Sequence, residues 1–529
     1  MAEPKTAVRA LFRLAVFLPI TASVLAGVRP SGAAPETVVR TVDLPVRGLL
    51  PRTAGPGVSV VGGELRAVTA AETSPARVCA PIWATGVGVV WAQRTEGGVH
   101  VLLAPEDARG VPLPEAHLDA EDDADPGTPD FEAGQRGSSF LWTGGSRCVR
   151  LALDLPPGAR VSDLRVVFVN SSGTAGGPGK GPPNRGPIAT NGPSLATASA
   201  LAQRPRIVGR EQWGADPGLM NCTPLVADEV LMGFVHHTAG SNAYSREEAD
   251  DVVRAVYAYH TNGRGWCDVG YNFLVDRYGT IYEGRSGGVD LPVIGAAQMG
   301  FNTGAFSVSV MGNFETAAVP KAVQRSLVRL IAWRLDVAHV NPLARATMTS
   351  AGGDTTRFQM GETVRLRTIS GHRDTGFTAC PGARLYSFLP ELRERVASRG
   401  LPKIYKPRLS RDELEVGRPA NVRIRARGSG PLTWSVSVLA PDGSVYAELG
   451  EASGANLDLT WSRTGSPAQP SVAGDYAIVI TAAGSDGASA RGSTLPLAVI
   501  LAPTPPPTPS PSPSPSATPS PSVTAGVGP

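Results

Sequence analysis

The stretch VLMGFVHHTAG, residues 230–240, decides how the central part of the chain is interpreted. It is an apolar run that ends at two adjacent histidines, His236 and His237. If this run forms a β-strand, neighbouring side chains point to opposite faces, so only one histidine can face a given site. Alternation groups His236 with Phe234 and His237 with Val235, and it leaves open which of the two faces carries a site.

Helical and extended patterns alternate on both sides of this run. Three segments have the apolar spacing or the capping residues of helices, at residues 245–257, 320–331 and 385–396. Two further segments predict a hairpin over residues 273–282 and a strand at residues 306–310. We therefore expect a central α/β domain over residues 205–400, with a mixed sheet flanked by helices.

Short alternating runs of strand-forming residues fill the blocks on either side of this centre. Residues 37–170 predict an N-terminal all-β domain, and residues 403–500 predict an immunoglobulin-like β-sandwich. The expected fold class is multidomain, with the α/β domain between two all-β domains. Gly, Pro and Ser are dense in residues 171–204, which is typical of a flexible linker, and Pro, Ser and Thr dominate residues 501–529, which predicts a disordered tail.

An acidic stretch interrupts the N-terminal block. Residues 119–130 contain five aspartates and one glutamate. A calcium loop is conceivable for such a set, but the spacing does not match an EF-hand and no glycine stands at the required position. The composition favours a solvated loop.

The N-terminus has the pattern of an export signal. Three basic residues precede an apolar run at residues 14–28, and small residues suited to cleavage follow it. Residues 1–34 are therefore predicted to be a signal peptide. The run is shorter than the ~20 residues of a spanning helix, so a membrane anchor is the less favoured alternative. We expect the mature chain to be secreted or held in the cell wall, away from the membrane.

The net charge and the cysteine content limit which ligands and which cysteine roles are expected. The net charge of +3 over 529 residues gives no electrostatic case for nucleic acid binding. Export favours disulfides, and the five cysteines leave one over. Cys79 and Cys148 fall in the N-terminal block, whereas Cys222, Cys267 and Cys380 fall in the central block. One of these three therefore has another role or stays a buried thiol.

A second candidate cluster is GHRDTGFTACPG, residues 371–382. Its glycines and Pro381 disfavour a regular helix, so His372 and Cys380 are expected on a folded loop. A thiolate and two imidazoles form a reasonable ligand set for zinc (Zn2+), and three protein ligands leave a fourth position for water, as in catalytic zinc sites. The spacing alone is not specific, because most histidines make ordinary structural contacts.

Several strings in the central block match a known family, in the family's order and at its spacing. They are REQWGA at 210–215, VHHTAG at 235–240, GWCDVGYNFLV at 265–275, YEGR at 282–285, GFN at 300–302, MGNF at 311–314 and the loop at 371–382. Residues 205–398 thus resemble the peptidoglycan recognition proteins and the related phage-lysozyme-type N-acetylmuramoyl-L-alanine amidases.

The resemblance implies a zinc amidase. It implies that Zn2+ is held by His236, His372 and Cys380, and that zinc-activated water cleaves the amide between the lactyl group of muramic acid and L-alanine. Family members that lack the cysteine are typically binders without amidase activity, so Cys380 implies an enzyme. The alternative is a non-catalytic peptidoglycan-binding receptor or wall scaffold.

The resemblance also accounts for the cysteines. The family carries a disulfide whose positions correspond to Cys222 and Cys267. With Cys380 assigned to the metal, Cys79 and Cys148 remain as the second pair. The oligomeric state is left open.

Two more residues are implicated in catalysis by the same resemblance. Tyr271 matches a family tyrosine near the metal, where its phenol can hydrogen-bond the attacking water or the developing oxyanion; a core aromatic is the alternative. Thr378 stands where phage-type enzymes carry lysine and recognition-protein amidases carry threonine, and its hydroxyl can donate to an oxyanion. His237 is grouped with the substrate-contacting residues, and a supporting or packing role stays open.

Two residues bear on the choice of substrate. Gly265-Trp266 resembles the family variant associated with diaminopimelate-type stems, and Arg285 matches an arginine suited to the extra carboxylate of that residue. The structural alternatives are Trp266 in a core and Arg285 on a solvated turn. Ala297 replaces a family histidine, which puts one groove contact in doubt and weakly favours a receptor. The expected partner is peptidoglycan, as polymer or muropeptide.

Overall fold

The computed structural model describes residues 39–46, 55–94, 98–120, 124–173 and 201–501. The predicted signal peptide, most of the predicted linker and nearly all of the predicted tail lie outside these ranges. Hydrogen bonds join the described strands into sheets of ten, five, two and six strands. Within these ranges, no helix has both the length and the apolar character needed to cross a membrane.

Residues between 39 and 173 build the ten-stranded sheet. Its strands are β1 (Arg40–Pro45), β2 (Val58–Val61), β3 (Glu64–Ala67), β4 (Ala71–Glu72), β5 (Ala76–Gln93), β6 (His100–Pro105), β7 (Ala116–Leu118), β8 (Gln135–Gly137), β9 (Leu141–Leu155) and β10 (Arg160–Asn170). The first half of β5 alternates buried and exposed residues, as a half-covered strand does, whereas its second half is buried on both faces. Val89 faces the core of this sheet, and Val90 packs with residues of the central part.

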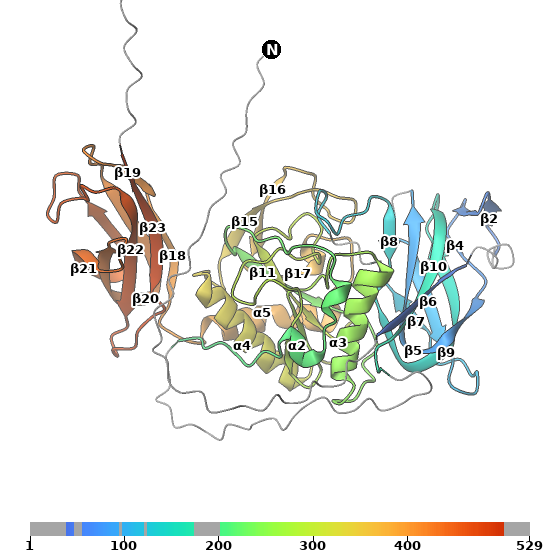
Figure 1. Ribbon diagram of the computed structural model, residues 1–529. Helices are drawn as coiled ribbons and strands as arrows, with labels where there is room; N and C mark the ends of the chain where they lie inside the picture. Colours follow the sequence, from blue (N-terminus) through green and yellow to red (C-terminus); the bar gives the residue numbers. More distant parts are fainter. Residues whose placement is uncertain (1–38, 47–54, 95–97, 121–123, 174–200, 502–529) are drawn as a thin grey trace, which may run out of the picture. The chain divides into compact units, whose positions relative to one another are not determined.

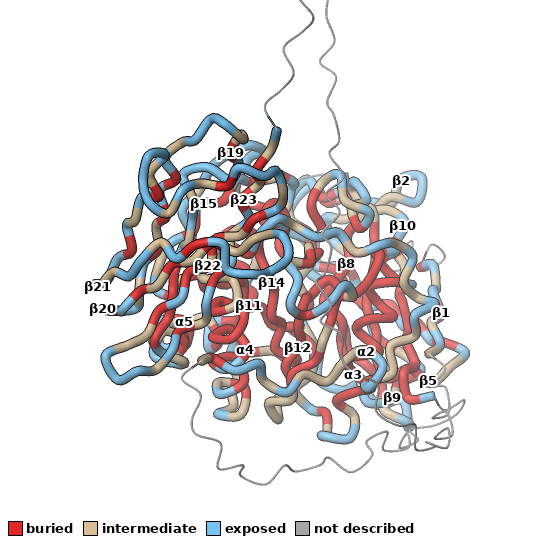
Figure 2. Tube along the Cα trace, turned by 60° about the vertical axis from the view of Figure 1, so that its left-hand side comes forward, coloured by how far each residue is buried: buried red, intermediate tan, exposed pale blue. Residues whose placement is uncertain are grey.

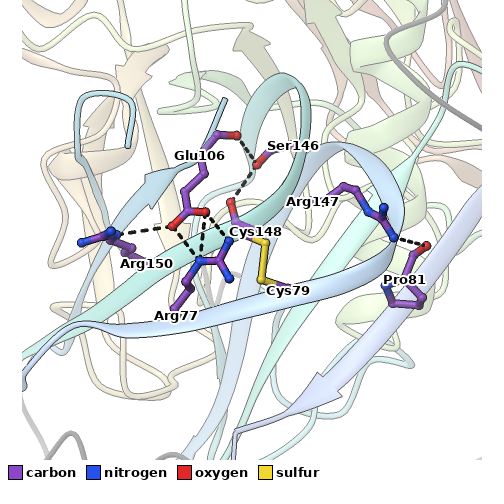
Figure 3. The surroundings of a disulfide bond; sticks show 8 residues. All are labelled: Arg77, Cys79, Pro81, Glu106, Ser146, Arg147, Cys148 and Arg150. Atoms are coloured by element: carbon purple, nitrogen blue, oxygen red, sulfur yellow. Dashed lines mark hydrogen bonds and ion pairs between the residues drawn. A yellow bond between two sulfur atoms is a disulfide. The ribbon is translucent and has the colours of Figure 1, made fainter. Parts of the chain in front are cut away.

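The disulfide between Cys79 and Cys148 joins facing residues of β5 and β9. Figure 3 shows Glu106, just after β6, beside this disulfide, where its carboxylate accepts hydrogen bonds from Arg77 and Arg150. The Nη2 atom of Arg77 lies 2.7 Å from Oε2 of Glu106, whose side chain is buried. A covalent link and an ion-pair cluster therefore tie three strands together on this side of the sheet.

The five-stranded sheet of the central part is mixed. Its strands, in spatial order, are β13 (Ile281–Glu283), β12 (Phe273–Val275), β14 (Ala305–Val310), β11 (Met232–His237) and β17 (Ile369–Gly371). The pair β12 and β13 is the antiparallel hairpin that the sequence predicted, whereas β11 is parallel to both of its neighbours. Every residue of β11 is buried, as expected for a parallel strand covered on both faces.

Helices and short helical turns complete the central part. They are α2 (Arg210–Trp213), η1 (Pro217–Leu219), α3 (Ala249–Ala258), η2 (Tyr259–Gly263), α4 (Lys321–Val337), η3 (His372–Asp374) and α5 (Ala383–Ala397). The capping box predicted before α3 is present: the Ser245 N–H donates to the Glu248 carboxylate at 2.7 Å, and the Glu248 N–H donates to the Ser245 hydroxyl at 3.3 Å. Gly263 ends η2, close to where the sequence placed the end of this helix.

Two helices cover one face of the central sheet. Figure 1 shows α4 and α5 side by side, and Leu327 of α4 and Leu385 of α5 belong to one apolar core with Val308 of β14. The buried segments in Figure 2 run through α4 and β11. This core includes Val235 of β11 and Ile369 of β17, and both strands lead into the candidate site.

The two-stranded sheet and the C-terminal sheet contain strands that the sequence patterns missed or divided. The former pairs β15 (Arg345–Thr349) with β16 (Thr363–Arg367), and the latter contains β18 (Ile404–Leu409), β19 (Glu413–Glu415), β20 (Val422–Leu439), β21 (Val445–Trp461), β22 (Gly474–Ala483) and β23 (Ser493–Ile500). Two of the short alternating runs of the C-terminal block, residues 422–425 and 434–438, both belong to β20. The six C-terminal strands join into one hydrogen-bonded sheet around Trp434, so the two-sheet immunoglobulin-like arrangement stays a prediction.

Candidate functional site

Three side chains converge at the end of the central sheet: His236, His372 and Cys380. Each offers one ligand atom, and these atoms all lie within 4.8 Å of one another. The two imidazole rings have their centroids 4.9 Å apart, and Cys380 Sγ lies 3.8 Å from His236 Nδ1. All three side chains are buried, so the trio is a compact set of metal-ligating groups shielded from bulk water.

Adjacent parallel strands bring the trio together. His236 lies near the end of β11, and the neighbouring β17 runs directly into the loop that carries His372 and Cys380. The Arg373 N–H donates to the Cys380 carbonyl at 2.9 Å, which closes this loop. Gly376 packs against the His372 ring so closely that a Cβ there would lie 2.7 Å from Nε2, so the loop needs a glycine at this position.

Strand alternation left the choice between the adjacent histidines open, and the structure places them differently. His236 joins the trio, whereas Nδ1 of His237 accepts a hydrogen bond from the Phe314 N–H at 3.2 Å. Burial lowers the pKa of His237 to about 4, so its ring is neutral and can serve as this acceptor. The His237 backbone N–H lies 3.4 Å from Cys380 Sγ and can donate to a thiolate.

The trio fits a zinc ion on the chemistry of its donor atoms. Burial, together with the nearby His372 and His237, holds the pKa of His236 well below its usual range, and a metal ligand requires this neutral form. Nε2 of His236 is buried with no hydrogen-bond partner among the described residues. Cys380 lies outside both disulfides, which pair Cys79 with Cys148 and Cys222 with Cys267. Two imidazoles and one cysteine sulfur are ordinary zinc ligands.

Tyr271 and Thr378 line a small cavity beside the trio. The cavity has a volume of about 10 Å³. The Tyr271 ring lies 5.6 Å from the His236 ring, and the Thr378 hydroxyl accepts a hydrogen bond from the Cys380 N–H at 3.1 Å. Both residues that the sequence implicated in catalysis are therefore next to the trio.

Part of the cavity wall comes from the N-terminal block, which the sequence did not connect with the site. The wall residues from that block are Asp119, Ala120 and Ser139. Asp119 lies 3.4 Å from the imidazole of His100 on β6. No periodicity or motif linked this acidic stretch to the histidines, because the contact joins segments that are far apart along the chain.

Trp266 and Arg285 are both buried against residues of the N-terminal block. Trp266 is buried against Ala124 and Phe131, and Arg285 is buried in an ion pair with Asp130. The alternative of a solvated turn for Arg285 is therefore wrong, because this guanidinium is only 6% exposed.

The acidic stretch differs from its prediction as a solvated loop. Asp125 and Asp130 are 3% and 5% exposed, whereas residues 121–123 lie outside the described part of the chain. Asp125 accepts hydrogen bonds from the Gly300 N–H at 2.6 Å and from the Asn302 side chain at 2.9 Å. The prediction is wrong for these aspartates because distant N–H groups replace the water that a buried carboxylate loses.

Ala297, where the family carries a histidine, is buried in this region. Its N–H donates to the Asn302 side chain at 2.9 Å. The next residue, Gln298, donates from its side chain to the His372 carbonyl at 3.2 Å. This turn therefore supports the loop of the trio without an imidazole at position 297.

Known proteins similar to this chain match its central part. The family model described as N-acetylmuramoyl-L-alanine amidase matches residues 227–383. Peptidoglycan-recognition protein SC2 of Drosophila simulans is 28% identical over 182 residues, which cover 34% of this chain and 83% of that protein. Peptidoglycan recognition protein 1 of Bos taurus is 30% identical over 186 residues, which cover 35% and 83% respectively.

Solved structures cover a similar share of this chain. Drosophila PGRP-LB is 24% identical over 34% of this chain and 91% of its own, with a TM-score of 0.27. On the sequence matches, the chain belongs to the family of peptidoglycan recognition proteins and N-acetylmuramoyl-L-alanine amidases.

Proposed function

We propose that this chain is a secreted, zinc-dependent N-acetylmuramoyl-L-alanine amidase. It hydrolyses the lactyl–L-alanine amide of peptidoglycan with diaminopimelate-type stems. The observation that carries this proposal is the convergence of His236, His372 and Cys380 within 4.8 Å. Family membership supports the substrate, because the matched family model is an amidase and the relatives are named for recognising peptidoglycan.

The three ligands supply what a catalytic zinc needs. When bound there, zinc lowers the pKa of water and polarises a carbonyl. The His237 N–H lies within reach of Cys380 Sγ and can donate a hydrogen bond to a ligating sulfur, and the buried His236 stays in the neutral form that a metal ligand requires. The Gln298 side chain holds the backbone of His372 in place.

Tyr271 and Thr378 are the candidates for stabilising the reaction's charge. Both hydroxyl-bearing side chains line the cavity beside the trio. A hydroxyl that points at the scissile carbonyl can donate a hydrogen bond as that oxygen gains negative charge. Neither group carries a positive charge, so each can offer only a hydrogen bond, and a metal held by the trio would supply most of the oxyanion stabilisation.

Arg285 and Trp266 are assigned to the stem peptide. A guanidinium can bind a carboxylate through two parallel hydrogen bonds, which suits the extra carboxylate of diaminopimelate. Trp266 directly precedes Cys267 in the sequence, and the disulfide of Cys267 with Cys222 anchors the chain there. In the described structure, Phe131 and Asp130 of the N-terminal block cover this region.

A second candidate function is a non-catalytic peptidoglycan receptor. The names of the relatives as recognition proteins favour this function. Ala297 favours it too, because alanine removes one groove contact that a family histidine would make. The complete trio favours the enzyme, because a pure receptor has no need of a buried cysteine and two histidines in this arrangement.

Digestion of purified diaminopimelate-type wall tests the two functions. The enzyme releases free stem peptides, and this release stops with a chelator and in Cys380→Ala. Zinc binding without peptide release supports the receptor instead.

A further inference from the structure

Residues 124–136 follow β7 and include the first two residues of β8; we call them the covering segment. They belong to the N-terminal block, and several of their side chains are buried against the central part. Asp125, Asp130, Phe131 and Arg136 all make contacts there. The covering segment therefore lies over the region that the proposed function assigns to the substrate.

The carboxylate of Asp130 forms an ion pair with the guanidinium of Arg285. Its Oδ2 accepts a hydrogen bond from Arg285 Nη2 at 2.5 Å, and its Oδ1 accepts one from the Cys267 N–H at 2.9 Å. The two side chains are 2% and 4% exposed, so the ion pair is withdrawn from water. The guanidinium that would bind a substrate carboxylate already holds a carboxylate from its own chain.

The covering segment makes further contacts with the central part on both sides of this ion pair. Asp125 accepts hydrogen bonds from the N–H groups of Gly300 and Asn302, in the turn whose Gln298 side chain donates to the His372 carbonyl. Phe131 packs on Trp266. Beyond them, Arg136 pairs with the half-exposed Asp354.

Little space is left beneath the covering segment. The cavity beside the trio measures about 10 Å³, and the one between the segment and Trp266 about 20 Å³. Each holds about one water molecule. Ligand pockets are typically about 300–1,000 Å³, so a muropeptide cannot enter while the segment is in place.

We propose that the covering segment is an internal ligand that keeps the site closed, with Asp130 standing in for the substrate's carboxylate on Arg285. A muropeptide gains access only when the segment leaves, so the chain as described is the latent form. The regulation of hydrolysis rests on the proposed function. The competition for Arg285 concerns binding alone, so it can be measured without catalysis.

The first test is the affinity of full-length, chelator-treated protein for N-acetylmuramoyl-L-alanyl-D-isoglutamyl-diaminopimelate. Asp130→Asn leaves Arg285 as a buried cation without its counter-charge under the segment, which opens the site. The dissociation constant is expected to fall by about 100-fold as the open population rises. Asp336→Asn is the matched control, since Asp336 is also buried and paired with an arginine, Arg491 at 2.9 Å; its affinity stays at the wild-type value.

The second test uses the wild-type chain, so it holds even where the variant folds poorly. Hydrogen exchange at the Gly300 N–H, which donates to Asp125, reports whether the segment is docked. Saturating muropeptide is expected to speed this exchange, although ligands normally slow exchange near their site. Slower exchange, or an affinity of Asp130→Asn equal to or below wild type, overturns the proposal and makes the segment a wall of the site. A 100-fold affinity gain without stem-peptide release in any variant keeps this proposal and rejects the amidase.

Discussion

Cys380 Sγ lies 3.8 Å from His236 Nδ1, although 144 residues separate the two in the chain. The contact depends on two parallel strands, because β11 carries His236 and β17 delivers the loop of Cys380. A metal site built this way is held by the core of the sheet. Changes to the groups around it are therefore expected to alter chemistry or metal affinity more than folding.

The phenol of Tyr271 is predicted to act on the reaction and not on the metal. Tyr271→Phe removes one hydrogen-bond donor at the cavity, so kcat is expected to fall by about 100-fold while zinc affinity is unchanged. Steady-state kinetics on a muropeptide and a zinc competition assay measure the two effects. Tyr257→Phe is the control, because the Tyr257 hydroxyl donates to the Asp216 carbonyl, away from the cavity. An unchanged kcat in Tyr271→Phe would reduce Tyr271 to a packing residue.

Gly376 is predicted to be required for the position of His372. Gly376→Ala adds a Cβ 2.7 Å from His372 Nε2, so the ring has to move. We expect zinc affinity to fall by about 10- to 100-fold, measured by competition with a chromogenic chelator. Gly430→Ala is the matched control, since a Cβ at Gly430 meets nothing within 4 Å. Equal zinc affinities in the two variants would show that the ring does not depend on this glycine.

Asp125 is predicted to make stability depend on pH. Burial raises its pKa from the ordinary 3.8 to about 6, against the opposing hydrogen bonds from Asn302 and Gly300. The folded state then binds the proton more tightly than the unfolded state, so this contribution is fully present below pH 4 and is lost as pH rises through 6. The loss corresponds to about 3 kcal/mol at 1.36 kcal/mol per pKa unit.

Denaturant unfolding at pH 4.5 and pH 7 measures this effect in wild type and Asp125→Asn. The wild type is expected to lose stability relative to the variant as pH rises, because asparagine does not titrate. Parallel changes in the two proteins would mean that Asp125 titrates normally and that its hydrogen bonds offset its burial.

The sequence predicted the central fold well where the signals are local. The capping box at Ser245 and the hairpin of β12 and β13 depend on residues close in the chain, and both are present. The strand β20 contains two of the expected alternating runs, residues 422–425 and 434–438, which Gly- and Pro-containing residues 428–431 separate in the sequence. In the structure the strand continues through a register shift between Arg427 and Leu432, which pairing with β21 stabilises.

The site could be predicted only in part. Alternation showed that His236 and His237 face opposite ways, and the family resemblance was needed to choose between them. The burial of Asp130 could not be predicted, because its composition suggests solvent and its partner Arg285 is 155 residues away. Contacts between blocks depend on tertiary packing, and no local pattern encodes them.

Metal content and product analysis on the same preparations test the central claim most directly. The wild-type chain is predicted to bind one equivalent of zinc and to release stem peptides with a free L-alanine amino group from diaminopimelate-type peptidoglycan. Cys380→Ala and chelator-treated wild type are predicted to release none, and zinc is predicted to restore activity only in the wild type. Full stem-peptide release by Cys380→Ala in the presence of chelator would contradict a zinc amidase built on His236, His372 and Cys380.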